Sequence, residues 1–294
     1  MTMRKTIEIE IESRENGLAL KAVLSKEVGL SRREISRLKF AHGLFINGQE
    51  ARVTQPVYTG DQVTLIFPEK DTPHALRLLQ KPDILYEDDD IVIVNKPAGM
   101  VCHPSHEHLD DDMGTLLQNY YGEGFTIREV GRLDKDVSGI MVYAKNQPSA
   151  ARLSKQRSQE VLHKVYDAVA QGIFETDSGT LRYGLRKVEG RKDRKISSDG
   201  QQCITDYAVV GTCQGCSILK VSIRTGRTHQ IRAGMAQAGH PLCGDELYGG
   251  SKQRINRPAL HCGHVELIQP FTKEKITVDC DLPDDMKCLL TEGE

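Results

Sequence analysis

Apolar residues recur at every second position along much of this chain, which is the spacing of half-buried β-strands. The alternation marks "KVYDAVAQG" at 164–172, "CSILKVSIR" at 216–224 and both halves of "HVELIQPFTKEKITVDC" at 264–280. Two further β-rich runs flank the acidic turn of "ILYEDDDIVIVNKPAG" at 84–99. Helical stretches are fewer, such as 146–160, which begins with asparagine, a residue favoured at helix N-caps. The pattern predicts an α+β fold around a mixed, mostly antiparallel central sheet.

The stretch "GLSRREISRLKF" at 29–40 predicts a capped helix with a cationic face. Ser31 and Glu34 have the spacing of a capping box, so the helix should begin one residue after the serine. Apolar residues at helical spacing face a core, and basic residues lie on the outer surface. These basic residues are Arg32, Arg33, Arg37 and Lys39. Such a charge cluster is most often only a solvated face, and RNA binding is the alternative interpretation.

Two turns follow this helix. Asn47-Gly48 supplies the positive φ angles of a two-residue hairpin, and Gly60-Asp61 precedes a third strand at 62–67. A basic helix followed by these strands, over roughly residues 14–67, resembles the S4 RNA-binding domain. The polar stretch 68–82 holds three prolines and predicts a linker. We therefore expect an S4-like domain at 1–67, a linker at 68–82 and a catalytic domain at 83–294.

Composition narrows the functional classes. The 294 residues are 38% hydrophobic, enough for a sizeable core, yet no apolar run reaches the roughly 18 residues of a membrane span. The first residues also lack the apolar segment of a signal peptide, so we expect a cytoplasmic protein without membrane association. The net charge of −2 means that any surface for nucleic acid is local.

The eight cysteines are scattered, and we expect them to be reduced. Cys213 and Cys216 form a C-x-x-C pair, but no second ligand pair lies nearby in the sequence. A turn with two small thiols is therefore favoured over a zinc site. We expect no metal.

Three polar segments adjoin predicted strands: "GRLDKDVSG" at 131–139, "HKVYDAV" at 163–169 and "RTGRTHQIRAGMAQAGHPLCGDELYGG" at 224–250. Residues two apart in an extended segment share a face, so Arg132 and Asp134 should point the same way. Each segment also has an ordinary interpretation as a loop or half-buried strand. Spacing alone does not join them into one site.

These segments resemble those of the RluA-type pseudouridine synthases. "GRLDKDVSG" is similar to that family's H-R-L-D-x-x-T-S-G signature. "DILYEDDDIVIVNKPAGMVCHP", "GRTHQIR…GHPLCGDELYG" and "RPALHCGHVEL" are similar to its other segments in the same order, over roughly residues 83–283. The resemblance implies a catalytic domain without metal or organic cofactor that converts uridine to pseudouridine in structured RNA. Ribosomal RNA is the first expectation for the target and transfer RNA the second, with a monomer as the working unit.

The resemblance also assigns roles to particular residues. It places the catalytic aspartate at Asp134, the active-site tyrosine at Tyr166 and the basic partner of the aspartate at Arg232. Arg132 falls on the arginine that helps to displace or replace the target base. A carboxylate can attack C1′ of the ribose or remove the 2′ proton, and the sequence leaves both routes open. Asp136 is interpreted as a turn residue.

Three positions depart from the family pattern. Gly131 and Gly234 stand where histidine is usual, and Val137 stands where threonine is usual.

Two other functions are alternatives to the synthase. The first is a non-catalytic RNA-binding or ribosome-assembly factor, which would bind RNA without catalysing a reaction. The second is a glycoside or nucleoside hydrolase that uses Asp134, and such an enzyme needs a second carboxylate in the site.

Overall fold

The computed structural model describes residues 6–30, 32–67, 81–103, 112–122, 126, 128–191 and 193–291. The chain divides into two compact units, one formed by 1–80 with 104–112 and the other by 81–103 with 113–294. The predicted linker at 68–82 lies almost entirely outside the described residues. The predicted domain boundaries therefore stay predictions.

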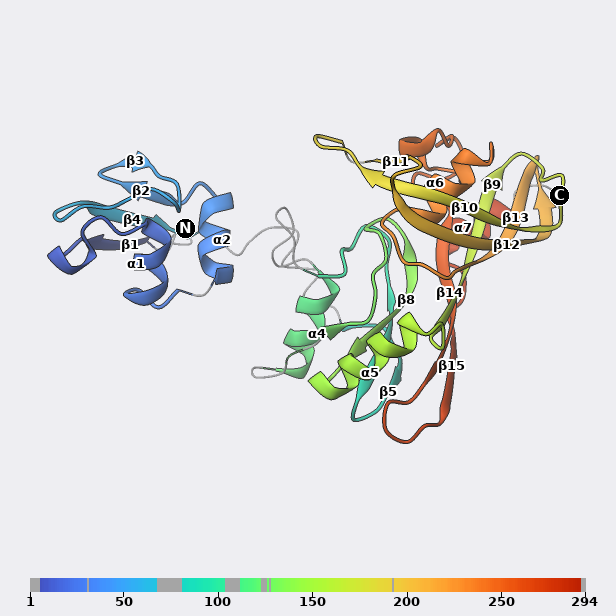
Figure 1. Ribbon diagram of the computed structural model, residues 1–294, viewed down its shortest axis with the longest axis horizontal. Coiled ribbons are helices and arrows are strands. Elements are labelled where there is room, and N and C mark those ends of the chain that lie inside the picture. The colour runs from blue at the N-terminus through green and yellow to red at the C-terminus, as the bar shows by residue number, and fades with distance from the viewer. Residues whose placement is uncertain are drawn as a thin grey trace. The chain divides into compact units, whose positions relative to one another are not determined.

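In its described residues, the N-terminal unit combines the α-helices α1 and α2 with a four-stranded antiparallel sheet of order β1-β4-β2-β3 (Figure 1). Its elements are β1 (Thr6–Glu10), α1 (Leu20–Lys26), α2 (Arg32–Phe40), β2 (Leu44–Ile46), β3 (Gln49–Glu50) and β4 (Gln62–Ile66). Helix α2 begins at Arg32 as predicted, although Ser31 itself lies outside the described residues. Asn47 and Gly48 have φ angles of 50° and 77°, which confirms the predicted hairpin turn.

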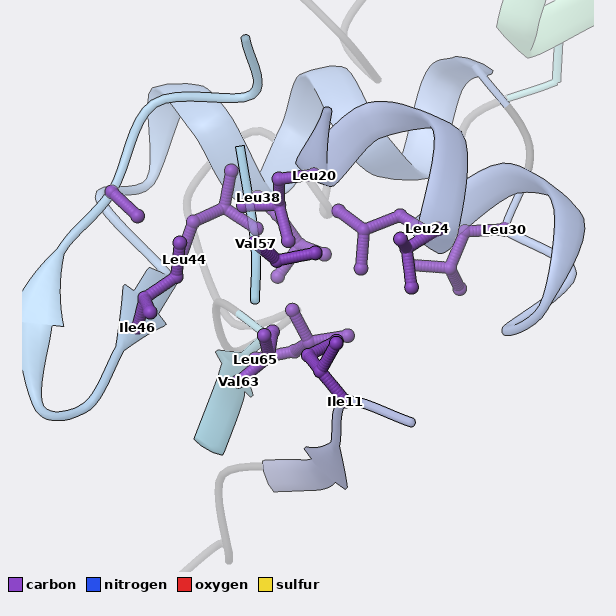
Figure 2. Packing of buried hydrophobic residues seen from close by; sticks show 12 residues of the cluster. Ile11, Leu20, Leu24, Leu30, Leu38, Leu44, Ile46, Val57, Val63 and Leu65 are labelled. Atoms are coloured by element: carbon purple, nitrogen blue, oxygen red, sulfur yellow. The ribbon is translucent and has the colours of Figure 1, made fainter. Parts of the chain in front are cut away.

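Burial of the apolar faces of α1, α2 and the sheet holds this unit together (Figure 2). Leu20 and Leu24 of α1 and Leu38 of α2 meet Leu44 and Leu65 of the sheet, and all five are at most 1% exposed. Because full burial of a leucine is worth about 1.5–3 kcal/mol, these contacts are the main source of the unit's stability. The apolar side of α2 is therefore buried in the core of this unit.

The larger unit is built on one extended sheet of order β11-β10-β12-β13-β9-β14-β8-β6-β5 (Figure 1). In addition, β15 pairs with β14 and β7 pairs with β8. The strands are β5 (Ile84–Glu87), β6 (Ile91–Lys96), β7 (Arg128–Glu129), β8 (Ser138–Ala144), β9 (His163–Gln171), β10 (Ser178–Lys187), β11 (Arg194–Ile196), β12 (Gln201–Cys213), β13 (Cys216–Ile223), β14 (Leu260–Ile268) and β15 (Lys275–Asp279). The helices are α4 (Met113–Tyr121), α5 (Gln147–Ser158), α6 (Gln230–Gln237) and α7 (Asp284–Thr291).

Among the described strand pairs, β8 with β14 is parallel and the others are antiparallel, which confirms the mixed, mostly antiparallel sheet. The strands expected around 84–99, 164–172, 216–224 and 264–280 are present. Asn146 caps α5 as expected and accepts a hydrogen bond from the backbone N–H of Ser149 at 2.9 Å. The strands β10, β11 and the long β12 were not among those predicted from the sequence.

The neighbouring strands β9, β14 and β8 bring the polar segments together. In the register, Cys262 of β14 faces both Gly139 of β8 and Tyr166 of β9. Gly139 has a φ of 108°, and a Cβ there would overlap the backbone of Cys262. Only glycine permits this close approach. The start of β8, and with it the loop that carries Asp134, is therefore held against β14, whose other edge pairs with β9.

Candidate active site

A cleft of about 860 Å³ opens where the loop before β8, the strand β9 and the loop before α6 meet. Three segments that the sequence leaves unconnected contribute side chains to it. Its lining includes Arg132, Asp134, Tyr166, Arg224, Arg227, His229 and Arg232. The four site residues predicted in the larger unit, Arg132, Asp134, Tyr166 and Arg232, therefore line one cavity together with further basic residues.

An ion-pair network forms the floor of this cleft. Arg232, on α6, donates from Nε and Nη2 to both carboxylate oxygens of Asp245, each at 2.7 Å. Its remaining nitrogen, Nη1, lies 3.3 Å from Oδ2 of Asp134. Arg232 and Asp245 are 6% and 1% exposed. Burial opposes the charge on the guanidinium, but the hydrogen bonds and charge of Asp245 outweigh it, and the pKa of Arg232 is raised.

Asp245 is a site residue that no sequence pattern indicated, because Gly244-Asp245 is also typical of an ordinary turn. The residue does precede a short 3-10 helix, Glu246–Tyr248, but its side chain points inward to Arg232. Since both of its oxygens are engaged, it fixes the plane of the guanidinium. Arg232 can then present one nitrogen to Asp134 in a set orientation.

Asp134 and Arg132 face the cleft from the same loop, as their spacing predicts. Leu133 between them is buried, and its backbone N–H lies 3.2 Å from the Cys102 sulfur. The guanidinium of Arg132 is exposed and donates from Nη2 to the Thr228 hydroxyl at 2.9 Å. Asp136 lies in the following turn and is exposed, in agreement with its interpretation as a turn residue.

Tyr166 presents its ring to the cleft from β9 and is only 4% exposed. Burial raises the pKa of its hydroxyl well above the usual value, so that the phenol is neutral at physiological pH. A neutral tyrosine offers a flat apolar ring and one hydroxyl. That combination suits stacking on a nucleobase better than proton abstraction.

Two departures from the family pattern have a structural reason, and for Gly131 it is a φ of 85°, which residues with a Cβ seldom adopt. The Nη1 atom of Arg157, another cleft residue, lies 3.4 Å from where a Cβ on Gly131 would stand. An arginine from α5 thus occupies the space beside Gly131. A Cβ on Gly234 would overlap the ring of Tyr183, whose hydroxyl donates to the Gln230 carbonyl at 2.5 Å. Nothing in the structure explains the valine at position 137.

The predicted RNA-binding residues of the N-terminal unit lie on α2, as expected. The side chains of Arg32, Arg33 and Arg37 are outside the described part of the structure, and Lys39 is exposed. Their role in binding stays a prediction.

Comparisons with known proteins agree with this geometry. Residues 90–237 match the family described as RNA pseudouridylate synthase, and residues 7–63 match the N-terminal domain of the RluD ribosomal pseudouridine synthase. YjbO of Bacillus subtilis, an uncharacterized RNA pseudouridine synthase, is 36% identical over 274 residues, covering 91% of this chain and 96% of its own. The chain belongs to the RNA pseudouridylate synthase family.

Other relatives of this pseudouridine synthase extend the comparison. The ribosomal large subunit pseudouridine synthase D of Zymomonas mobilis is 31% identical over 295 residues, with 92% of this chain and 91% of that protein covered. Human RNA Pseudouridylate Synthase Domain Containing 4 has the same fold, with a TM-score of 0.60 at 20% identity, covering 73% of this chain and 94% of the human chain. Membership of an enzyme family disfavours a purely RNA-binding role.

The synthase was expected to work without metal, and its cysteines to be reduced. Among the described residues, no group of three or more histidine, cysteine, aspartate or glutamate side chains is arranged to hold a metal ion. All eight cysteines are free, and Cys213 and Cys216 flank the turn between β12 and β13. Within the described part of the chain, no helix is long and apolar enough to cross a membrane.

Proposed function

We propose that this pseudouridine synthase modifies large-subunit ribosomal RNA and that Asp134 is the carboxylate that reacts with the target nucleotide. The contact of Asp134 with a buried arginine, inside a cleft that also holds Tyr166, carries the assignment of the site. The match of residues 7–63 to the RluD N-terminal domain and the relative from Zymomonas mobilis support the choice of RNA. Transfer RNA is the second candidate substrate, and we expect the chain to act as a monomer in the cytoplasm.

The reaction requires that the N1–C1′ bond of uridine breaks, that uracil turns, that C5 bonds to C1′, and that C5 then loses its proton while N1 gains one. Asp134 can attack C1′ and be released when C5 replaces it, or it can remove the 2′ proton and return it after the new bond forms. Both routes need a carboxylate held against the ribose while the base moves. Arg232, itself held by Asp245, supplies that fixed orientation.

The target base must leave its stack before its ribose can reach Asp134. Enzymes that act on a base commonly flip the nucleotide into a pocket and pay the cost of unstacking. Tyr166 offers the ring on which the extruded uracil stacks. Arg132, exposed at the rim of the cleft, is placed to fill the space that the base vacates. The basic residues Arg32, Arg33, Arg37 and Lys39 of the N-terminal unit bind phosphates of the folded RNA.

Hydrolysis of a glycosidic bond is the rival chemistry, and Asp245, which shares Arg232 with Asp134, is one candidate for its second carboxylate. Both oxygens of Asp245 are bonded to Arg232, and the residue is 1% exposed. It is therefore not available to activate water. The buried pair therefore does not supply the second carboxylate of a hydrolase.

The substrate can be tested by mapping pseudouridines in ribosomal and transfer RNA from cells with and without the gene. We expect at least one large-subunit position to lose its pseudouridine and to regain it when the wild-type gene is restored. A gene carrying Asp134→Asn should not restore it. Loss confined to transfer RNA would contradict the proposed substrate, and restoration by Asp134→Asn would contradict the proposed carboxylate.

A further inference from the structure

His229 occupies an unusual place in the cleft. It precedes α6 with φ 59° and ψ 20°, the left-handed conformation that residues with a Cβ seldom adopt. Its carbonyl accepts the N–H of Ala233 at 2.9 Å, and its side chain is only 14% exposed. The adjacent Gln230 anchors the same loop and accepts the backbone N–H of Arg227 at 3.1 Å. A disfavoured backbone held this firmly in the site suggests that the imidazole has a task.

The hydrogen-bond partners of His229 determine which ring nitrogen carries the proton. Nδ1 lies 3.0 Å from the hydroxyl of Tyr248, and that hydroxyl accepts the backbone N–H of Arg194 at 2.7 Å. Among the described residues, the tyrosine proton has no other acceptor than Nδ1. Burial lowers the pKa of His229, so the ring is neutral near pH 7. Tyr248 therefore donates to Nδ1, and the histidine proton is on Nε2.

This tautomer directs a donor at the reacting carboxylate. Nε2 of His229 lies 3.9 Å from Oδ2 of Asp134, the same oxygen that Nη1 of Arg232 approaches at 3.3 Å. The other oxygen, Oδ1, accepts no hydrogen bond from any described residue. Two donors on one side of a carboxylate leave its opposite oxygen free.

We infer that His229 is a positioning residue whose Nε2–H, together with Arg232, holds Oδ2 of Asp134 and turns Oδ1 toward the ribose. The separation of 3.9 Å is longer than a hydrogen bond, so the contact closes when the nucleotide is bound. The inference rests on the proposed role of Asp134. It assigns the reaction to one named oxygen and gives His229 and Tyr248 a joint function.

Two substitutions at position 229 separate this role from a merely structural one. Glutamine places an amide nitrogen near the position of Nε2, whereas asparagine reaches only as far as Nδ1. Asparagine, however, tolerates the left-handed backbone better than glutamine. A positioning role therefore predicts that His229→Gln is the more active variant. A role limited to backbone shape predicts the opposite order.

The measurement is the single-turnover rate of pseudouridine formation with enzyme in excess over RNA, beside the RNA dissociation constant of each variant. We expect His229→Asn to react about 30-fold more slowly than wild type with little change in affinity, because one hydrogen bond to a charged group is lost. His229→Gln should regain most of that loss. His264→Gln, on β14 outside the cleft, is the matched control and should react like wild type.

Equal rates for the two variants at position 229, or a faster His229→Asn, would overturn the inference. Asp134→Asn in the same assay separates this failure from failure of the proposed function. If Asp134→Asn is inactive while glutamine gives no rescue, only the role of His229 is wrong. If Asp134→Asn forms product, the proposed carboxylate is wrong as well.

Discussion

Replacing Asp245 by asparagine should destabilise the larger unit far more than an equivalent change at the surface. The carboxylate forms two hydrogen bonds of 2.7 Å with Arg232, and both residues are buried. Removing one partner of a buried ion pair costs about 3–5 kcal/mol, because the other charge is left uncompensated. Asparagine keeps one acceptor for the guanidinium. We therefore expect Asp245→Asn to lower the free energy of unfolding by about 3 kcal/mol.

The pair of Arg257 and Asp285 provides a control with the same fork geometry. Asp285 accepts from Nε and Nη2 of Arg257 at 2.6 and 2.8 Å, but its side chain is 45% exposed. Arg257 also donates to the carbonyls of Pro258 and Leu260. The bonds to these carbonyls remain in the variant, and water can reach the exposed side of the pair in place of the lost carboxylate oxygen. Asp285→Asn should therefore cost only about 0–1 kcal/mol.

Urea unfolding followed by tyrosine fluorescence measures both variants. The chain has no tryptophan and nine tyrosines, of which only Tyr58 belongs to the N-terminal unit, so the signal reports mainly on the larger one. With an m-value of about 2 kcal/mol/M, Asp245→Asn should lower the midpoint by about 1.5 M and the control by less than about 0.5 M. Equal shifts, or no shift for Asp245→Asn, would refute the reasoning from burial.

Three further predictions concern other parts of the chain. Replacing Arg33 and Arg37 together by alanine should weaken binding to folded RNA and flatten its salt dependence, while turnover of a saturating minimal substrate persists; an unchanged salt slope would contradict their role. Burial lowers the pKa of Lys96 from 10.5 to about 8 in the folded protein. Between these two pH values the unfolded chain binds more protons than the folded one, so the free energy of unfolding should rise by about 2 kcal/mol from pH 8 to 9.5. This rise, measured by urea midpoints, should vanish in Lys96→Met, and an identical rise in both proteins would refute it. Pseudouridine formation should survive excess EDTA once the RNA is folded; activity that returned only with zinc would show that Cys213 and Cys216 bind metal.

The sequence predicted those parts of the fold whose signals are local. Asn47-Gly48 specifies a turn through its own backbone preferences, and Asn146 caps α5 through its own side chain. The strands β10 and β12 carry polar residues at many positions and interior glycines such as Gly184 and Gly211. The strands that pair with β12 are β13, which follows it after a short turn, and β10, which precedes it in the chain. Periodicity in one sequence does not report such pairing.

The site was predictable only in part for the same reason. The residue types came from a resemblance, but the cleft exists because β8 pairs in parallel with β14, and β14 pairs with β9. Asp245 looks like a turn residue until its contact with Arg232 is seen. The glycine at position 234 likewise depends on Tyr183 of β10, whose ring occupies the space that a Cβ would need. Contacts of this kind are tertiary, and no local pattern encodes them.

The central claim is that the carboxylate of Asp134 performs the chemistry, and Asp134→Asn tests it most directly. Asparagine keeps the size of the side chain but can neither attack C1′ nor accept the 2′ proton, whereas RNA binding depends on the basic surfaces. Asp136→Asn, in the exposed turn two residues later, is the matched control. The measurement is tritium release from C5-labelled uridine in RNA, together with a binding assay for each variant. We expect no detectable release and near-normal affinity for Asp134→Asn, and most of the activity for Asp136→Asn; appreciable turnover by the first variant, or equal loss in both, would contradict the account.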